Sequence, residues 1–242
     1  MTTSNPALRA DTFSSVPFDA ASGTMTIRGT AAKTLILLGL ATLSASYSWS
    51  HAAGGTGMGL AMLGLFVGGI AGLILCFKQT WAPVLAPVYA VFEGLFLGGI
   101  SALFAARYGG IVMQAVALTF GTLFALLAAY QSGYIRATGR FKLGVVAATG
   151  GICIVYFLSL ILGLFNVRIP GIFGSGPVGI VFSLIVVGIA ALNLILDFDL
   201  IEQGAASGAP KYMEWYGGFA LMLTLVWLYL EILRLLAKLR DR

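Results

Sequence analysis

Long apolar runs alternate with short polar segments along almost the whole chain after residue 30. Seven of these runs reach roughly 18–26 residues, which is enough for a helix to cross a hydrocarbon core of ~30 Å. The runs are continuously apolar rather than alternating, and this favours helices over a β-barrel. We therefore predict an all-α, polytopic membrane protein with seven transmembrane helices. The predicted spans are residues 34–51, 57–77, 81–106, 111–130, 143–165, 177–201 and 217–236.

The composition supports a single membrane domain. Of the 242 residues, 59% are hydrophobic and only 10% are charged, whereas a soluble domain carries about 25% charged residues. We assign residues 31–242 to the transmembrane domain and residues 1–30, which are polar, to a disordered cytosolic tail. One histidine and two separated cysteines cannot build a typical zinc or haem site, so we expect no cofactor.

The basic residues are scattered over short loops and the C-terminus. No single basic face emerges, so the net charge of +5 predicts contact with lipid headgroups rather than nucleic acid. With the N-terminus in the cytosol, eight lysines and arginines fall on the inner side, while the outer loops carry only Arg107 and Arg168. The C-terminal Arg234, Lys238, Arg240 and Arg242 conflict with this orientation, because seven crossings place them outside. Either this basic tail snorkels at the outer interface, or the last span does not fully cross. We still expect a cytosolic N-terminus, since early loops usually set orientation.

Glycines recur every four residues in two of the predicted spans. Gly64, Gly68 and Gly72 form one such row, and Gly94 and Gly98 begin another. Rows of this kind let helix backbones approach closely and gain dispersion contacts. We expect both rows to be helix–helix contacts without chemical function.

Glu93 lies near the middle of the third predicted span. So short a side chain cannot reach the interface from that depth, so it must face the protein interior, either protonated or paired. Two interpretations stay open. Glu93 either binds protons or cations, which we favour, or is a hydrogen-bonded acid that fixes helix packing.

The sixth predicted span ends in acidic residues. Asn193 and Asp197 are four residues apart and project from one helical face, so we expect Asp197 to point into the bundle. Asp199 lies about 200° around the helix from Asp197, and Glu202 continues its face. For Asp199 and Glu202 a solvated helix end at the cytosolic boundary is the preferred interpretation, with a place in the ion path as the alternative.

Glu231 lies in the last third of the seventh predicted span. Arg234 follows three residues later, so an intrahelical ion pair can reduce the cost of both charges near an interface. The alternative is that Glu231 is a further polar group that an ion contacts as it passes along the same path as the other acids.

Three segments resemble the Bax inhibitor-1 family, also called the transmembrane Bax-inhibitor-motif family. They are Trp81-Ala-Pro83-Val-Leu-Ala-Pro87 leading into Phe92-Glu93-Gly94-Leu-Phe-Leu-Gly98, then Asp197-Phe-Asp199-Leu-Ile, and finally Leu230-Glu231-Ile-Leu-Arg234-Leu-Leu. The resemblance covers roughly residue 34 to the C-terminus and is strongest to the bacterial branch with an extended N-terminal tail. It implies seven helices with the C-terminal helix central, in the bacterial inner membrane.

The same resemblance implies a pH-sensitive calcium leak. The family senses pH with an aspartate near the end of the sixth helix, which corresponds to Asp197, paired with a second aspartate in the seventh. The seventh-helix position corresponds to Thr224, which cannot titrate, so the paired-carboxylate sensor is in doubt in this chain.

Two functions therefore compete. The first is a cation leak channel, in which Glu93, Asp197 and Asn193 supply oxygen ligands for Ca²⁺, with Glu93 and Asp197 as tentative metal ligands. The second is a non-transporting membrane protein that modulates another membrane complex. An enzyme is not expected: the Phe173-Gly174-Ser175-Gly176 segment lacks the first glycine of a rhomboid-type motif, and both aspartates of the sixth span lie on one helix.

Overall fold

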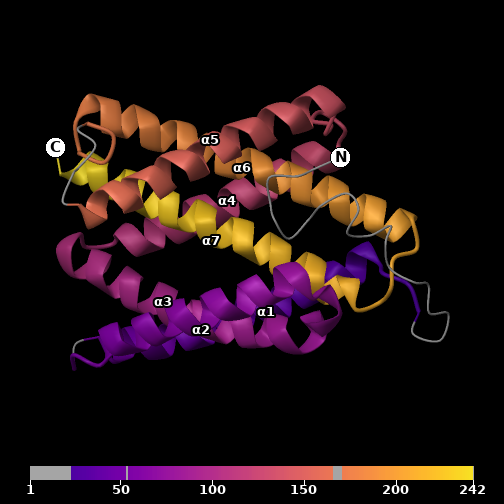
Figure 1. The fold of residues 1–242 in the computed structure, drawn as a ribbon, viewed down its shortest axis with the longest axis horizontal. Coiled ribbons are helices and arrows are strands. Elements are labelled where there is room, and N and C mark those ends of the chain that lie inside the picture. The colour runs from indigo at the N-terminus through magenta and orange to yellow at the C-terminus, as the bar shows by residue number, and fades with distance from the viewer. Residues whose placement is uncertain (1–22, 53, 166–170, 242) are drawn as a thin grey trace. The chain divides into compact units, whose positions relative to one another are not determined.

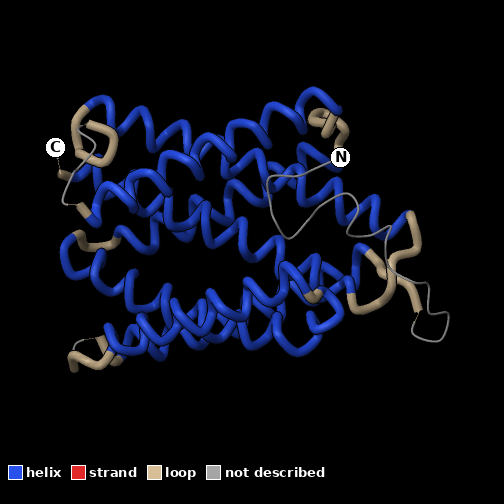
Figure 2. The backbone as a smooth tube through the Cα atoms, viewed as in Figure 1, coloured by secondary structure: helices blue, strands red, loops and turns tan. Residues whose placement is uncertain are grey.

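The computed structural model describes residues 23–52, 54–165 and 171–241, and this part of the chain folds into helices joined by short loops (Figures 1 and 2). Seven of the described helices are long and apolar enough to cross a membrane, which confirms the predicted all-α fold. Their bounds are α1 Ile27–Ser50, α2 Gly57–Phe77, α3 Ala82–Arg107, α4 Ile111–Gln131, α5 Gly139–Leu164, α6 Pro177–Ala206 and α7 Met213–Arg240, with the short 3₁₀ turn η2 Gln79–Trp81 before α3.

Several helices extend beyond the predicted apolar spans. Helix α1 begins at Ile27, seven residues before the predicted start of the first span, because the Thr26 side chain caps it by accepting a hydrogen bond from the Gly29 N–H. Helix α6 continues to Ala206 and stops before Gly208, whose φ of 74° suits glycine at a helix C-terminus. Most of the predicted N-terminal tail, residues 1–22, lies outside the described residues, as does Arg168.

Large apolar side chains cover the outside of the helices. Such an exterior would be unstable in water but is the one that a lipid environment favours. Helix α7 differs from the other six, because 67% of its most apolar stretch is buried against at most 39% for each of them. Helix α7 is therefore the most buried of the seven. Strongly exposed apolar residues include Leu35, Leu43, Phe66, Leu73, Phe124 and Leu160.

The chain divides into two compact units, each described here by itself. The described part of the first unit comprises residues 23–52, 54–109 and 199–223, and that of the second comprises residues 110–165, 171–198 and 224–241. Helices α6 and α7 contribute to both, since the divisions fall after Phe198 and after Leu223.

Helix α3 is the centre of packing in the first unit. It lies against both α1 and α2, which touch each other far less. The Gly64/Gly68/Gly72 row of α2 faces α3: a Cβ added at Gly64 would overlap the carbonyl oxygen of Phe92, and one at Gly68 would lie 3.4 Å from the Glu93 backbone nitrogen. The predicted helix–helix contact is therefore present.

The second glycine row, Gly94 and Gly98, lies on a different face of α3 and contacts α1. A Cβ added at Gly94 would overlap the backbone of Ala41, and one at Gly98 would overlap that of Ala45. Both contacts are to α1, so glycines allow close approach on two faces of the same helix.

The close contact at Gly64 can be tested with an alanine substitution. We expect Gly64→Ala to lower the stability of the folded protein in detergent by roughly 1–3 kcal/mol, because the added methyl group strikes backbone rather than a movable side chain. Thermal unfolding of the purified protein measures this. Gly69→Ala is the matched control, since a Cβ there meets no described atom within 4 Å. Equal stability of the two variants would contradict the assignment.

Candidate functional site

Glu93 faces the interior of the first unit. It is buried on α3, with 9% of its surface exposed, and a Cβ added at Gly68 of α2 would lie 3.4 Å from its Oε2 atom. The hydroxyl of Tyr89, one turn earlier on α3, donates a hydrogen bond to the carboxyl group. Tyr89 in turn packs edge-on against Phe219 of α7, with ring centroids 4.8 Å apart. The predicted inward orientation of Glu93 is thus confirmed.

Asn193 and Asp197 share the buried face of α6 in the second unit. Asp197 is fully buried, and Asn193 is 2% exposed. The Asn193 Nδ2 group donates to Thr149 Oγ1 on α5 at 2.9 Å and to the carbonyl oxygen of Ile189 at 2.8 Å. The shared face was predictable from the spacing of the two residues. The choice of Thr149 as the hydrogen-bond partner of Asn193 was not predictable, because nothing in the sequence indicates which polar residue of another helix lies opposite Asn193.

Asp199 and Glu202 occupy a different environment. Asp199 is half-buried and Glu202 is exposed, and Gln203 Nε2 donates to Asp199 Oδ2 one turn away. These positions agree with the preferred interpretation of a solvated helix end. Asp197, two residues earlier but on the opposite side of α6, is the buried acid of this segment.

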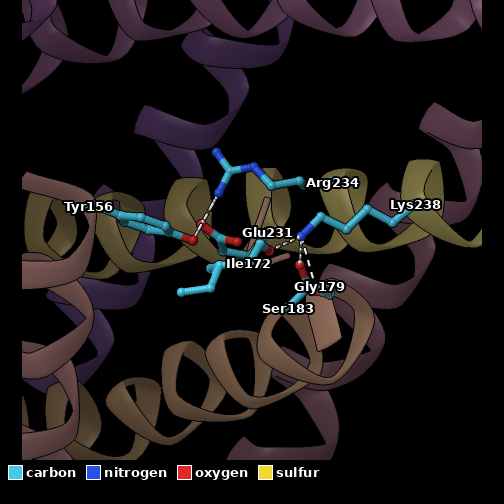
Figure 3. Close-up of polar contacts among 7 residues, drawn as sticks. All are labelled: Tyr156, Ile172, Gly179, Ser183, Glu231, Arg234 and Lys238. Atoms are coloured by element: carbon cyan, nitrogen blue, oxygen red, sulfur yellow. Dashed lines mark hydrogen bonds and ion pairs between the residues drawn. The ribbon is translucent and has the colours of Figure 1, made fainter. Parts of the chain in front are cut away.

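Glu231 is part of a three-residue polar cluster between α5 and α7 (Figure 3). Its Oε1 atom accepts hydrogen bonds from Tyr156 OH and Arg234 Nη1, each at 2.8 Å. Arg234 Nη1 also donates to Tyr156 OH at 2.9 Å. The predicted Glu231–Arg234 ion pair is therefore present, while the tyrosine that ties it to α5 was missed by the sequence analysis.

The sequence analysis named Lys238 only as a basic residue of the C-terminal tail and missed its buried, hydrogen-bonded position in the second unit. Only 5% of it is exposed. Its Nζ atom donates to the carbonyl oxygens of Ile172 and Gly179, each at 3.0 Å, and to Ser183 Oγ at 2.8 Å (Figure 3). All three acceptors lie in the loop before α6 or in its first turns. Lys238 therefore fastens the C-terminal end of α7 to the N-terminal end of α6.

A further unpredicted acid, Glu214, joins α7 to the start of α1 in the first unit. Its buried carboxylate accepts hydrogen bonds from the Thr26 N–H and hydroxyl, at 3.1 and 2.8 Å, and pairs with Lys211 at 2.8 Å. A carboxylate at the N-terminus of a helix is favoured by the helix dipole. Backbone hydrogen bonds from Met25 to Ala209 and from Lys211 to Gly23 extend this connection.

The acids of the candidate site are distributed over both units. Glu93 belongs to the first unit, whereas Asn193, Asp197 and Glu231 belong to the second. Among the described residues, no group of three or more His, Cys, Asp or Glu side chains could hold a metal ion. Glu93 and Glu231 each have hydrogen-bond partners of their own.

The comparisons with known proteins agree with this architecture. A family model described as "Bax inhibitor 1 like" matches residues 5–241. The chain belongs to the Bax inhibitor 1 like family. Neither the curated proteins nor the solved structures contain a match. Family membership and the seven membrane-length helices together make this a multi-pass membrane protein of the Bax inhibitor type.

The sequence analysis compared two positions of this chain, Asp197 and Thr224, with a sensor pair. Asp197 is fully buried in the second unit. Thr224, the corresponding position on α7, is 4% exposed. The threonine thus occupies a buried position without contributing a second carboxyl group.

The Asn193–Thr149 hydrogen bond can be tested by removing its acceptor. We expect Thr149→Val to destabilise the protein by about 1 kcal/mol, because it keeps the side-chain shape but leaves a buried Asn193 N–H without this acceptor. Thermal unfolding in detergent measures the change. Thr119→Val is the matched control, since Thr119 is equally buried but its hydroxyl donates to Ala115 of its own helix. A cost no larger than that of the control would contradict the assignment.

Proposed function

We propose that this protein is a pH-sensitive leak channel for Ca²⁺ or another cation. The observation that carries the proposal is Asp197, an acid with no exposed surface on a helix long and apolar enough to cross a membrane. An ionisable group at such a position is costly and is usually retained for function. Family membership supports the same conclusion, because the resemblance implies a calcium leak.

The polar groups offer the ligand chemistry that such a cation needs. Ca²⁺ prefers several oxygen ligands, and Glu93, Asp197 and the Asn193 side-chain carbonyl supply oxygens, with backbone carbonyls as further candidates. The ion in this proposal is cargo that passes weak sites in succession, so no closed set of protein ligands is needed. Asp199 and Glu231 would attract cations nearer the ends of the helices.

Protonation of Asp197 supplies the pH sensitivity. The ionised carboxylate attracts a cation, and the protonated acid does not, so the flux depends on the charge of this residue. In a pair of carboxylates, like-charge repulsion moves one titration to higher pH. Because Thr224 provides no second carboxylate, we expect a shallower response, or one at lower pH, than a two-aspartate protein would give.

A non-transporting protein that modulates a membrane partner is the second candidate. The hydrogen bonds of Asn193 to Thr149 and of Glu231 to Tyr156 favour it, since they show polar groups engaged in holding helices together. On this alternative, the buried acids are structural and no ion passes. We propose no enzymatic activity in either case.

We further propose that the protein lies in a bacterial inner membrane with its N-terminus in the cytosol. The basic residues of the sequence support this orientation, and the resemblance to the bacterial branch supports the location. The lipid bilayer and the transported cation are the expected partners.

Glu93→Gln tests whether the mid-membrane acid takes part in transport. The substitution keeps the shape and the hydrogen bond from Tyr89 but removes the charge, so the protein should fold and its cation flux in proteoliposomes should fall. Glu202→Gln is the control, because Glu202 is exposed at the end of the sixth span. Equal cation flux in the two variants would contradict a role of Glu93 in transport and would leave it a structural residue.

Substitutions of Asp197 and Thr224 test whether Asp197 is the group that makes cation flux depend on pH. We expect Asp197→Asn to flatten the dependence of flux on pH, because it removes the titrating group. Thr224→Asp should steepen the response and move its midpoint to higher pH, because a second buried carboxyl group makes ionisation of the pair harder. Calcium flux through the purified protein in liposomes, measured across a pH series, gives both curves. If neither substitution changes the curve, Asp197 is not the gate.

A further inference from the structure

The ammonium group of Lys238 is a positive charge held inside the second unit. Lys238 lies in the last turn of α7, where a lysine side chain can extend outward to water or headgroups, yet only 5% of it is exposed. An ammonium group has three N–H donors, and Nζ bonds three oxygens, on Ile172, Gly179 and Ser183 (Figure 3). Every donor is therefore used, so the charge is fixed in place.

The three acceptors of Lys238 are uncharged, which makes its own charge costly. Two of them are backbone carbonyl oxygens and the third is the Ser183 hydroxyl. A buried charge costs more free energy than a neutral polar group that makes similar hydrogen bonds, unless an opposite charge compensates it. Fastening α7 to α6 requires only a donor, so the positive charge itself calls for a functional explanation.

The neighbouring charges do not cancel that of Lys238. At the end of the second unit where α6 begins and α7 ends, Glu231 is already paired with Arg234 at 2.8 Å. Arg240 adds an exposed positive charge two residues beyond Lys238, and Asp241 adds an exposed negative one. Among the described residues at this end, three positive side chains thus accompany two negative ones, and the buried surplus is the ammonium of Lys238.

Lys238 lies nearer this end than the candidate cation ligands of α6 do. Its partner Ser183 precedes Asn193 by ten residues and Asp197 by fourteen, which corresponds to about 15 Å and about 21 Å along the helix axis. A cation that moves along α6 from this end therefore passes the fixed positive charge first. Repulsion grows in proportion to the charge of the ion, so Ca²⁺ is repelled more strongly than a monovalent cation.

We propose that Lys238 is a specificity-determining residue of the proposed channel, whose fixed ammonium repels cations, divalent ions most, and so limits the leak at the end where α6 begins. Ser183 and the two carbonyl groups position this charge. The effect on transport rests on the proposed function, whereas the positive potential around Lys238 does not.

Lys238→Gln tests the barrier in proteoliposomes, because glutamine keeps hydrogen-bond donors but carries no charge. Since the repulsion is proportional to ionic charge, a rise of about threefold in K⁺ flux should accompany a rise of about tenfold in Ca²⁺ flux. Ser183→Ala keeps the charge and removes one acceptor, so the Ca²⁺/K⁺ flux ratio should stay at its wild-type value. Arg240→Gln, which removes an exposed charge nearby, should also leave this ratio unchanged. An unchanged ratio in Lys238→Gln would overturn the proposal.

Thiol labelling measures the local potential without transport. Ile172→Cys, combined with Cys76→Ala and Cys153→Ala, places one thiol on a half-buried residue whose carbonyl oxygen lies 3.0 Å from Nζ. Its reaction rates with cationic and anionic methanethiosulfonate reagents are compared with and without Lys238→Gln. Loss of the charge should raise the cationic-to-anionic rate ratio by at least roughly tenfold, whereas looser packing would speed both reagents alike. The same ratio with and without the lysine would contradict the proposal.

The two measurements separate this inference from the proposed function. If neither the wild-type protein nor Lys238→Gln conducts a cation, the proposed function is wrong, and the labelling ratio still decides whether Lys238 repels cations. If the wild-type protein conducts cations and Lys238→Gln leaves the labelling ratio unchanged, this inference alone is overturned. Lys238→Met supplies a second neutral side chain of similar length for both measurements, in case the glutamine variant does not fold.

Discussion

A polar group at membrane depth must be satisfied inside the protein, because lipid offers no hydrogen-bond partner. This constraint accounts for the direction of the buried polar side chains described above. Glu93 turns towards Tyr89, Asn193 towards Thr149, and Glu231 towards Tyr156 and Arg234. Each pairing joins a polar group to its own or a neighbouring helix, so the groups that carry the candidate chemistry also determine how the helices pack.

Close helix packing makes these pairings possible. Without side chains at Gly64 and Gly68, α2 approaches α3 until the Glu93 backbone and carboxyl group are within van der Waals reach of α2. Such proximity excludes lipid from the acid and gives it a protein surface on one side. Larger residues at the same positions would separate the helices and leave Glu93 facing hydrocarbon, which is far more costly. The glycines have no chemistry of their own, but the burial of Glu93 depends on them.

The features predictable from sequence are those set by periodicity along one helix. The seven spans, the inward direction of Glu93, the shared face of Asn193 and Asp197, and the Glu231–Arg234 pair all follow from spacing. The partners of Asn193, Glu231 and Lys238, which are Thr149, Tyr156 and Ser183, could not be predicted from the sequence. Each partner lies on another helix, and packing between the helices decides which residues come opposite one another. The early start of α1 was missed for a related reason: its cap, Thr26, is bonded to Glu214, 188 positions away.

The basic end of α7 shows how such long-range contacts change a sequence argument. The sequence analysis counted the C-terminal basic residues only by the side on which they would fall. Lys238 is instead buried and bonded to three oxygens near the start of α6, and Arg240 Nη2 donates to Gln114 Oε1 at 2.9 Å. Arg234 is neutralised by Glu231. The acceptors of Lys238 and Arg240 could not be predicted from the sequence, because they lie on other helices or in the loop before α6.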